Sequence, residues 1–252
     1  MNDSRNGRRF GIPRNRRLTW DLLAFNRHVP LCAHDRRMSL LPVSEARRNC
    51  NVRISWPTLF LRSYAIVAQS VPELRQSWHS WPIPHLYQNP DSVGIVTVHR
   101  DVDGSPWLFW GMIVTPENLS LVEIQQQIDT YQNGDVTRVF RRQWQLSLLP
   151  TVLRRLIWCW NLHFAARRRA RRLGTFFLST LAGRGVEIQL PPSIHTGCLT
   201  YGPLDQNGCA RVTLGYDHRI MDGSLVADVL VKLESVLNDQ IVSELAAIHA
   251  NA

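Results

Sequence analysis

The segment Val212–Gly223, VTLGYDHRIMDG, carries the pattern that decides the fold. It predicts a β-strand that ends at His218, followed by a tight segment that reaches Asp222 and Gly223 and then by a helix. A histidine at a strand end with an aspartate close behind it suits a general base, because imidazole titrates near neutral pH. The same residues also fit a polar loop histidine followed by an ordinary N-cap aspartate, and the spacing alone leaves both interpretations open.

The residues around this segment predict further strands and a closing helix. Cys198–Gly202 and Ala210–Tyr216 are strand-like runs, and Asn207-Gly208 between them is a strong hairpin signal. Gly174–Leu181, GTFFLSTL, predicts another strand. Ser224–Ile241 predicts a helix, because its apolar residues recur at helical spacing.

The N-terminal half also mixes helices with strands. Ser55 is a suitable N-cap with a proline shortly after it, and the helix that it opens is expected to end at Val71-Pro72. Two strand-like runs follow, Ser92–Val98 and Trp107–Val114, with an Asp-Gly turn between them. Ser120 then opens another helix, with capping-box spacing to a glutamate.

The composition is that of a folded protein with a strongly basic balance. The chain has 252 residues, 44% of them hydrophobic, which is enough for a substantial core. Its formal net charge of +9 favours polyanionic partners: nucleic acid, an anionic membrane or a cofactor that bears phosphate. No helix-turn-helix, zinc-finger or RNP motif is present, so we do not expect nucleic acid as a partner.

The cysteine and histidine patterns predict neither disulfides nor a metal site. The five cysteines are odd in number and none has C-x-x-C spacing, which is typical of reduced thiols in a cytoplasmic protein. Cys159 and His163 lie four residues apart, but two ligands make a poor metal site, so we interpret them as packing residues. The N-terminal segment 1–17 is polar and basic without an apolar core, so we do not expect a secretory signal, and no apolar run reaches the ~18 residues of a membrane span.

One segment is both apolar and basic. Pro150 is expected to open a helix of about 20 residues. Six of its side chains can share one broad face: Val152, Leu153, Leu156, Ile157, Trp160 and Phe164. Five arginines follow: Arg167, Arg168, Arg169, Arg171 and Arg172. Three interpretations stay open: a surface helix with cations near its C-terminus, an interfacial membrane helix, or a dock for the phosphates of coenzyme A or an acyl carrier.

The segment from Asp217 to Gly223 resembles the signature of a known superfamily. His218-Arg219-Ile220-Met221-Asp222-Gly223 resembles the His-x-x-x-Asp-Gly signature of chloramphenicol acetyltransferase. Extended by Asp217, the run is similar to the DHRxxDG signature of dihydrolipoyl acyltransferase catalytic domains of 2-oxoacid dehydrogenase complexes. The longer form is specific, because it stands between a β-rich run and an amphipathic helix as in that family.

The resemblance extends beyond the motif. Gly174–Leu181 is similar to the family's GTFTISNL segment, which places Ser179 at the oxyanion-binding serine, and Thr180 replaces the usual asparagine. The helices near Ser55–Gln69 and Leu119–Tyr131 also resemble family elements. Residues 18–240 follow the pattern, but 135–172 fit it poorly and are identified as a lineage-specific elaboration.

The resemblance implies an α+β chloramphenicol acetyltransferase-like two-layer fold, a mixed β-sheet flanked by helices. The expected domains are a basic flexible tail at 1–17, an acyltransferase catalytic domain at 18–245 with a divergent basic helical insert at 135–172, and a tail at 246–252. Family members place their active sites at subunit interfaces, so the resemblance also implies a homotrimer.

The implied activity is acyl transfer from a thioester, an acyl-coenzyme A, to a hydroxyl, amine or thiol acceptor, without a covalent acyl-enzyme and without a metal. His218 would be the general base and Ser179 the oxyanion donor. Asp222 would hold the loop by pairing with Arg16 or Arg17. Three more residues, Gly223, Asp217 and Arg219, would be structural at the site.

Two other functions are carried alongside. The basic insert is compatible with an acyltransferase fed by a lipoyl domain or an acyl carrier protein instead of free acyl-coenzyme A. The change at Thr180 and the divergent middle are compatible with a non-catalytic oligomeric scaffold. We expect a cytoplasmic location, with peripheral membrane contact through 150–172 as a further alternative. The acyl group and acceptor are not determined by the sequence.

Overall fold

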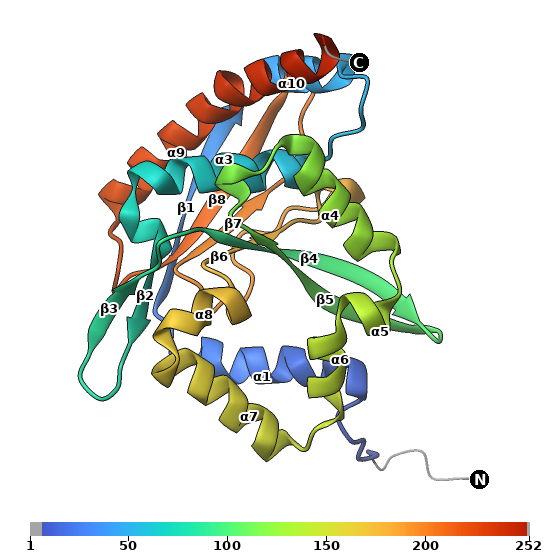
Figure 1. Ribbon diagram of the computed structural model, residues 1–252, viewed down its shortest axis with the longest axis vertical. Coiled ribbons are helices and arrows are strands. Elements are labelled where there is room, and N and C mark those ends of the chain that lie inside the picture. The colour runs from blue at the N-terminus through green and yellow to red at the C-terminus, as the bar shows by residue number, and fades with distance from the viewer. Residues whose placement is uncertain (1–6, 251–252) are drawn as a thin grey trace.

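Six strands form one mixed sheet in the computed structural model, which describes residues 7–250. These strands are β1 (Leu31–Ser39), β4 (Val93–Val102), β5 (Ser105–Val114), β6 (Phe176–Ser179), β7 (Gly197–Tyr201) and β8 (Cys209–Asp217). Their order is β1-β8-β7-β6-β4-β5 (Figure 1). Strand β6 runs parallel to β4 and β7, and the other pairs are antiparallel. The expected α+β fold is confirmed.

Turn residues set the sheet's hairpins. Val102 pairs with Ser105, so β4 and β5 are joined by Asp103 and Gly104 alone. Both have positive φ, 53° and 72°, as the two-residue hairpin turn requires. Between β7 and β8, Gly208 also has positive φ, at 71°, in the loop where the Asn-Gly signal predicted a hairpin. The sequence therefore specifies these two connections locally.

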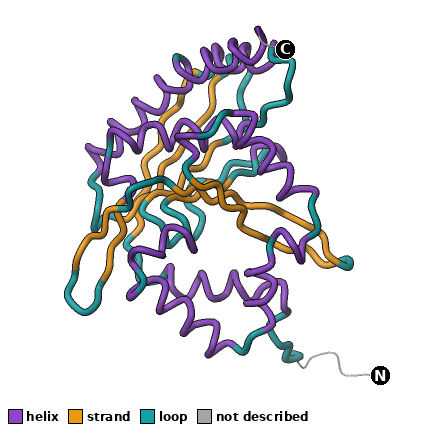
Figure 2. The backbone as a smooth tube through the Cα atoms, viewed as in Figure 1, coloured by secondary structure: helices purple, strands orange, loops and turns teal. Residues whose placement is uncertain are grey.

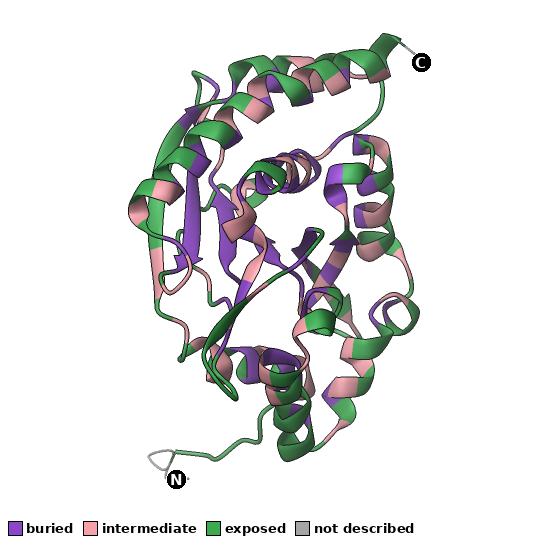
Figure 3. Ribbon diagram, turned by 60° about the vertical axis from the view of Figure 1, so that its left-hand side comes forward, coloured by how far each residue is buried: buried purple, intermediate pink, exposed green. Residues whose placement is uncertain are grey.

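One face of the sheet carries the main core. Against it lie α3 (Trp56–Ser70), α4 (Leu121–Asn133) and α9 (Gly223–Asn238), with α2 (Leu41–Asn49) and α10 (Gln240–Ala250) beside α9. Tyr64 of α3 stacks on Phe176 at a ring-centroid distance of 4.0 Å, and Phe60 stacks on Tyr201 at 4.2 Å. Buried residues gather on the central strands and on the inward sides of these helices (Figure 3).

The other face is covered by α1 and the insert (Figures 1 and 2). These elements are α1 (Arg17–Asn26), α6 (Arg141–Leu148), α7 (Thr151–Cys159), the π-helical turn η4 (Trp160–Phe164) and α8 (Ala166–Leu173). The short helix α5 (Val136–Val139) lies beside α4, and its Val136 belongs to the main core. Trp158 of α7 packs with Leu22 of α1 and with Ile194 in a small second core. Together with α1, the helices α6, α7 and α8 thus form a layer on this face of the sheet.

The helix expected to start at Pro150 is not continuous. It begins after Pro150 as predicted, but Ala165 N–H donates to the Trp160 carbonyl at 3.1 Å, five residues back, and the α-helical spacing is lost there. Ala165 itself leaves the helical region, with φ −108° and ψ 48°. Helix α8 therefore starts anew and carries Arg169 beneath the sheet.

The chain ends depart from the expected tails. Residues 1–6 and 251–252 lie outside the described residues. The Arg14 guanidinium stacks over the Trp144 ring at 4.0 Å and its Nε donates to the Ser147 hydroxyl at 2.9 Å, so packing begins at Arg14 and not at Leu18. At the other end α10 continues to Ala250, five residues into the expected tail. Arg14 is ordered by residues 144–147, and α10 is ordered by its packing against α2 and α9. A tail prediction made from local sequence does not include these distant contacts.

Smaller elements complete the fold. A second hairpin pairs β2 (Gln76–His79) with β3 (His85–Gln88), which the sequence did not predict. Short 3-10 turns are η1 (Arg14–Arg16), η2 (Pro72–Arg75), η3 (Pro116–Asn118) and η5 (Ala182–Arg184). Among residues 7–250, no helix has both the length and the apolar character that crossing a bilayer would require.

Candidate active site

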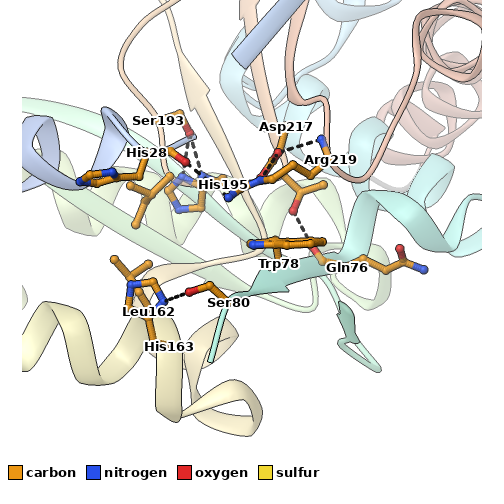
Figure 4. A network of polar contacts seen from close by, with 12 residues as sticks. His28, Gln76, Trp78, Ser80, Leu162, His163, Ser193, His195, Asp217 and Arg219 are labelled. Carbon is orange, nitrogen blue, oxygen red and sulfur yellow. Dashed lines mark hydrogen bonds and ion pairs between the residues drawn. The ribbon is translucent and has the colours of Figure 1, made fainter. Parts of the chain in front are cut away.

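Asp217 and Arg219 clamp the corner after β8 (Figure 4). The Asp217 carboxylate is 4% exposed and accepts three hydrogen bonds from Arg219: from the backbone N–H at 3.0 Å, from Nε at 2.9 Å and from Nη2 at 2.6 Å. The guanidinium also lies over the Trp78 ring, 5.3 Å from its centroid. Charge-assisted bonds of this kind hold a tight turn in one geometry.

His218 stands between these two residues and is turned outward. Its backbone N–H donates to the Pro30 carbonyl at 3.1 Å, while the residue itself is exposed. Its ring lies 5.5 Å from the Tyr216 ring, two positions back on the strand. The backbone of His218 is therefore held at the sheet's end, and its imidazole is accessible to a substrate or a second subunit.

Asp222 and Gly223 shape the start of α9. Asp222 Oδ1 accepts the Leu225 N–H at 2.9 Å, which makes this carboxylate the N-cap of the helix. A Cβ on Gly223 would lie 3.1 Å from the His34 ring, so only a glycine packs there without displacing the ring. Asp222 therefore has a structural role in the loop.

The expected arginine partner of Asp222 is wrong for the single chain. Arg17 instead donates to the Ser147 carbonyl at 3.0 Å, against the insert on the opposite face of the sheet from α9. Within residues 7–250 Asp222 makes no ion pair. The prediction was based only on where the arginines lie in the sequence. It did not foresee that Arg14 and Arg17 donate hydrogen bonds to Ser147 in the insert.

Ser179 is the last residue of β6 and is 7% exposed. Side chains alternate between the faces of a strand, so Ser179 shares the face of Phe177, toward the insert. The next residue, Thr180, donates from its hydroxyl to the Tyr201 carbonyl at 2.9 Å and accepts the Ala182 N–H at 3.0 Å. Threonine in place of the family's asparagine thus fixes the turn that follows Ser179.

One chain does not bring His218 and Ser179 together. The register places Ser179 beside Thr200 of β7, and Thr200 beside Thr213 of β8. His218 lies five residues further along β8, which corresponds to about 17 Å at ~3.4 Å per residue. The two side chains therefore lie at opposite ends of the sheet.

Arg169 is a buried cation that the sequence did not single out from its basic run. It is 9% exposed and its guanidinium donates to three carbonyls: Trp78 at 2.8 Å, Leu162 at 3.3 Å and Ile194 at 3.0 Å. Burial lowers the pKa of Arg169 to about 10, and the nearby charge of Asp217 offsets only part of this decrease. A cation thus ties the β2–β3 hairpin and the insert to the residues before β7, behind the Asp217 corner.

His195 is a second buried group that the sequence did not select. Its Nε2 lies 2.6 Å from the Leu173 carbonyl and its Nδ1 lies 3.0 Å from the Ser193 hydroxyl. Because a carbonyl can only accept, Nε2 carries the proton and Nδ1 accepts from Ser193. Burial lowers the pKa of His195 to about 4, so the ring is neutral at pH 7.

This shift predicts acid sensitivity. Between pH 6.5 and 4 the unfolded chain binds a proton at His195 that the native state does not, so the free energy of unfolding falls as pH falls. From pH 7 to pH 4.5 the loss from this residue is about 2 kcal/mol. Urea denaturation at both pH values should show a smaller loss for His195→Gln than for the wild type. His79, whose pKa burial also lowers to about 4, leaves part of the loss in the variant. Equal losses in the two proteins would contradict the assignment.

A cavity of about 720 Å³ lies between the sheet and the insert. Its lining is mostly apolar and comes from the sheet (Ile95, Trp110, Met112, Phe177), from α1 (Leu18, Leu22) and from the insert (Leu146, Ile157, Trp158). Three arginines also contribute: Arg141, Arg142 and Arg172. Ser179 follows Phe177 on the same face of β6, about 7 Å further along. The cavity therefore approaches the serine end of the sheet.

The histidines and cysteines that could bind a metal do not cluster in the described residues. His163 Nδ1 lies 3.1 Å from the Ser80 hydroxyl in the link between β2 and β3. In the part of the chain that the structure describes, no three His, Cys, Asp or Glu side chains converge as a metal site. All five cysteines are free thiols.

Comparison with known proteins identifies the fold. No protein-family model and no curated protein sequence matches the chain. Solved structures do match over nearly its whole length. A truncated catalytic core of the 2-oxoacid dehydrogenase multienzyme complex from Thermoplasma acidophilum has a TM-score of 0.64 at 15% identity, with 92% of this chain and 99% of that chain covered.

Two more solved structures agree with it. Azotobacter vinelandii dihydrolipoamide acetyltransferase, a structure concerned with a serine, a histidine and an asparagine in its catalytic mechanism, has a TM-score of 0.60 at 16% identity and covers 95% and 96% of the two chains. Chloramphenicol acetyltransferase has a TM-score of 0.51 at 12% identity and covers 86% and 94%. The chain has the chloramphenicol acetyltransferase-like fold that is shared by these acyltransferases, as the motif predicted.

Proposed function

We propose that the protein is an acyltransferase that moves an acyl group from a coenzyme A thioester to a hydroxyl, amine or thiol acceptor. The observation that carries the proposal is the exposed imidazole of His218 at the strand end, on a corner that the Asp217–Arg219 pair holds in place. If this ring were buried in the core, no substrate could reach it and it could not act as a base. The fold, which is that of known acyltransferases, supports the same function.

The chemistry needs no group beyond this chain and its substrates. His218 accepts the proton of the acceptor as the acceptor attacks the thioester carbonyl. The Ser179 hydroxyl donates a hydrogen bond to the oxyanion of the tetrahedral intermediate. The carbon–sulfur bond then breaks, and the imidazolium returns its proton to the departing thiolate. No acyl-enzyme forms, and the acyl group passes to the acceptor in one addition and one elimination.

The cavity supports an extended apolar acyl group. Its volume of about 720 Å³ falls within the usual size of ligand sites, and its lining is largely aliphatic and aromatic. A chain that occupies it points its carbonyl toward the Ser179 end of β6. The cations Arg141, Arg142 and Arg172 suit the phosphates of coenzyme A or of a carrier's pantetheine arm.

The separation of about 17 Å between His218 and Ser179 in one chain supports a site that is shared between two subunits of a homotrimer. If each site joins His218 of one subunit to Ser179 of the next, a chain that lacks one of these side chains can still contribute the other to a working site. Mixing His218→Ala chains with Ser179→Ala chains should then restore activity, because a normal histidine can face a normal serine. In a ring of three, random mixing in equal amounts gives about one quarter of the wild-type sites.

The mixing experiment has a direct control. Chains are unfolded together, refolded and assayed for thiol release, and the oligomeric mass is measured in the same sample. Mixing two variants of the same residue, His218→Ala with His218→Asn, should restore nothing. If the His218→Ala and Ser179→Ala mixture stays as inactive as its parents while the trimer re-forms, the shared site is wrong. Turnover only with carrier-bound acyl groups would identify a carrier protein as the donor.

A further inference from the structure

The outward side of the insert is an apolar ridge. Five side chains repeat at four-residue spacing along α6, α7 and the π-helical turn, and all are exposed: Leu148, Val152, Leu156, Trp160 and Phe164. Val152 is 70% exposed and Leu156 60% exposed. The same helix turns Trp158 and Arg154 inward, where Arg154 Nε donates to the Asp21 carboxylate at 2.6 Å. The internal contacts therefore fix which side faces out.

The β2–β3 hairpin enlarges the ridge. Its connecting loop exposes Trp81 and Ile83, and the Trp81 ring lies 4.9 Å from the Phe164 ring. We name the ridge together with this loop the insert face. Seven of the 20 large hydrophobic residues that are exposed in the described chain belong to the insert face. Such a concentration marks an interaction surface, since single exposed apolar residues are ordinary but contiguous ones are not.

The charge around the insert face has one sign. Residues 136–186 contain eleven arginines and no aspartate or glutamate. Arg154 and Arg169 are used inside the fold, and Arg172 donates to the Asn161 side chain. Others remain at the surface: Arg155, Arg167, Arg168 and Arg171. An apolar stripe bordered by arginines matches a surface that is apolar below and anionic above.

We propose that the insert face binds the surface of an anionic phospholipid bilayer. The apolar ridge enters the boundary between headgroups and acyl chains, with Trp81 and Trp160 at that level. The exposed arginines pair with lipid phosphates. A face-to-face pair of two insert faces fits less well, because it would bring arginines against arginines. The proposal does not depend on acyl transfer.

Vesicle flotation tests the proposal. The protein is mixed with vesicles of phosphatidylcholine alone or of phosphatidylcholine with phosphatidylglycerol, and floated protein is measured against lipid concentration. The wild type should bind the vesicles that contain phosphatidylglycerol, and high salt should weaken that binding. Arg167→Gln, Arg168→Gln and Arg171→Gln together should weaken it about 100-fold, at roughly fivefold per arginine.

A second variant addresses the ridge. Leu156→Ser with Trp160→Ser should lose binding to the same vesicles, while Val231→Ser, an exposed apolar residue on α9, should bind like the wild type. Thiol release from a water-soluble acyl-coenzyme A should be unchanged in the ridge variant, so failure of catalysis and failure of membrane binding are separate results.

Three outcomes would overturn the proposal. The first is no flotation of the wild type on any vesicle. The second is binding that neither the arginine nor the ridge variant changes. The third is a ridge variant that no longer floats and whose oligomeric mass, measured without lipid, also differs from that of the wild type. That result would make the insert face a contact between copies of the chain.

Discussion

Replacing His218 by alanine should lower the rate of acyl transfer by about 10²–10⁴-fold, the usual contribution of a general base. The loop should stay in place, because Asp217 and Arg219 hold it without using the imidazole. The measurement is thiol release from a panel of acyl-coenzyme A thioesters of increasing chain length. The loss should fall on kcat for every thioester that the wild type uses.

The matched control is His249→Ala. His249 is also an exposed histidine, but it lies in the last turn of α10, away from the candidate site. This variant should release thiol at the wild-type rate. If turnover is the same in His218→Ala as in the wild type, His218 is not the base, and the scaffold function would gain support.

Replacing Arg154 by methionine should lower the free energy of unfolding by about 3 kcal/mol. Asp21 is 1% exposed, and the substitution would leave its charge buried without its main partner. The low end of the range applies because Arg155 Nε lies 3.7 Å from the same carboxylate. Urea denaturation at pH 7 measures the change.

The control for this prediction is the neighbouring residue. Arg155 is 46% exposed along its side chain, and Arg155→Met should change stability by less than about 1 kcal/mol. Adding Asp21→Asn to Arg154→Met should recover part of the loss, since the unpaired charge is then gone. Equal effects of the two arginine substitutions would contradict the pairing of Arg154 with Asp21.

Much of the fold follows from short-range signals in the sequence. The turn at Asp103-Gly104, the capping box at Ser120 and the helix after Asp222 all depend on residues within about four positions of each other. The structure has each of them where the pattern predicted it. The resemblance of the DHRxxDG motif then supplied the mixed sheet flanked by helices, which no local signal contains; the strand order comes from the structure alone.

The insert shows where sequence patterns fail. An apolar stripe of helical spacing normally packs inward, yet here Val152, Leu156 and Trp160 face out while Arg154 is buried. The reversal depends on Asp21, 133 residues away, which no periodicity can indicate. Arg169 and His195 were missed for a similar reason, because backbone carbonyls are their main partners and carbonyls leave no trace in a sequence.

The pairing of α1 with α7 also has a consequence for synthesis of the chain. The ribosome releases α1 first and must add well over a hundred residues before Arg154 emerges to meet Asp21. During that time the apolar side of α1 has no neighbour, and neither does the underside of the growing sheet. Closure of this layer must therefore wait until α7 has emerged, and a chaperone that shields nascent apolar surface would act in that interval.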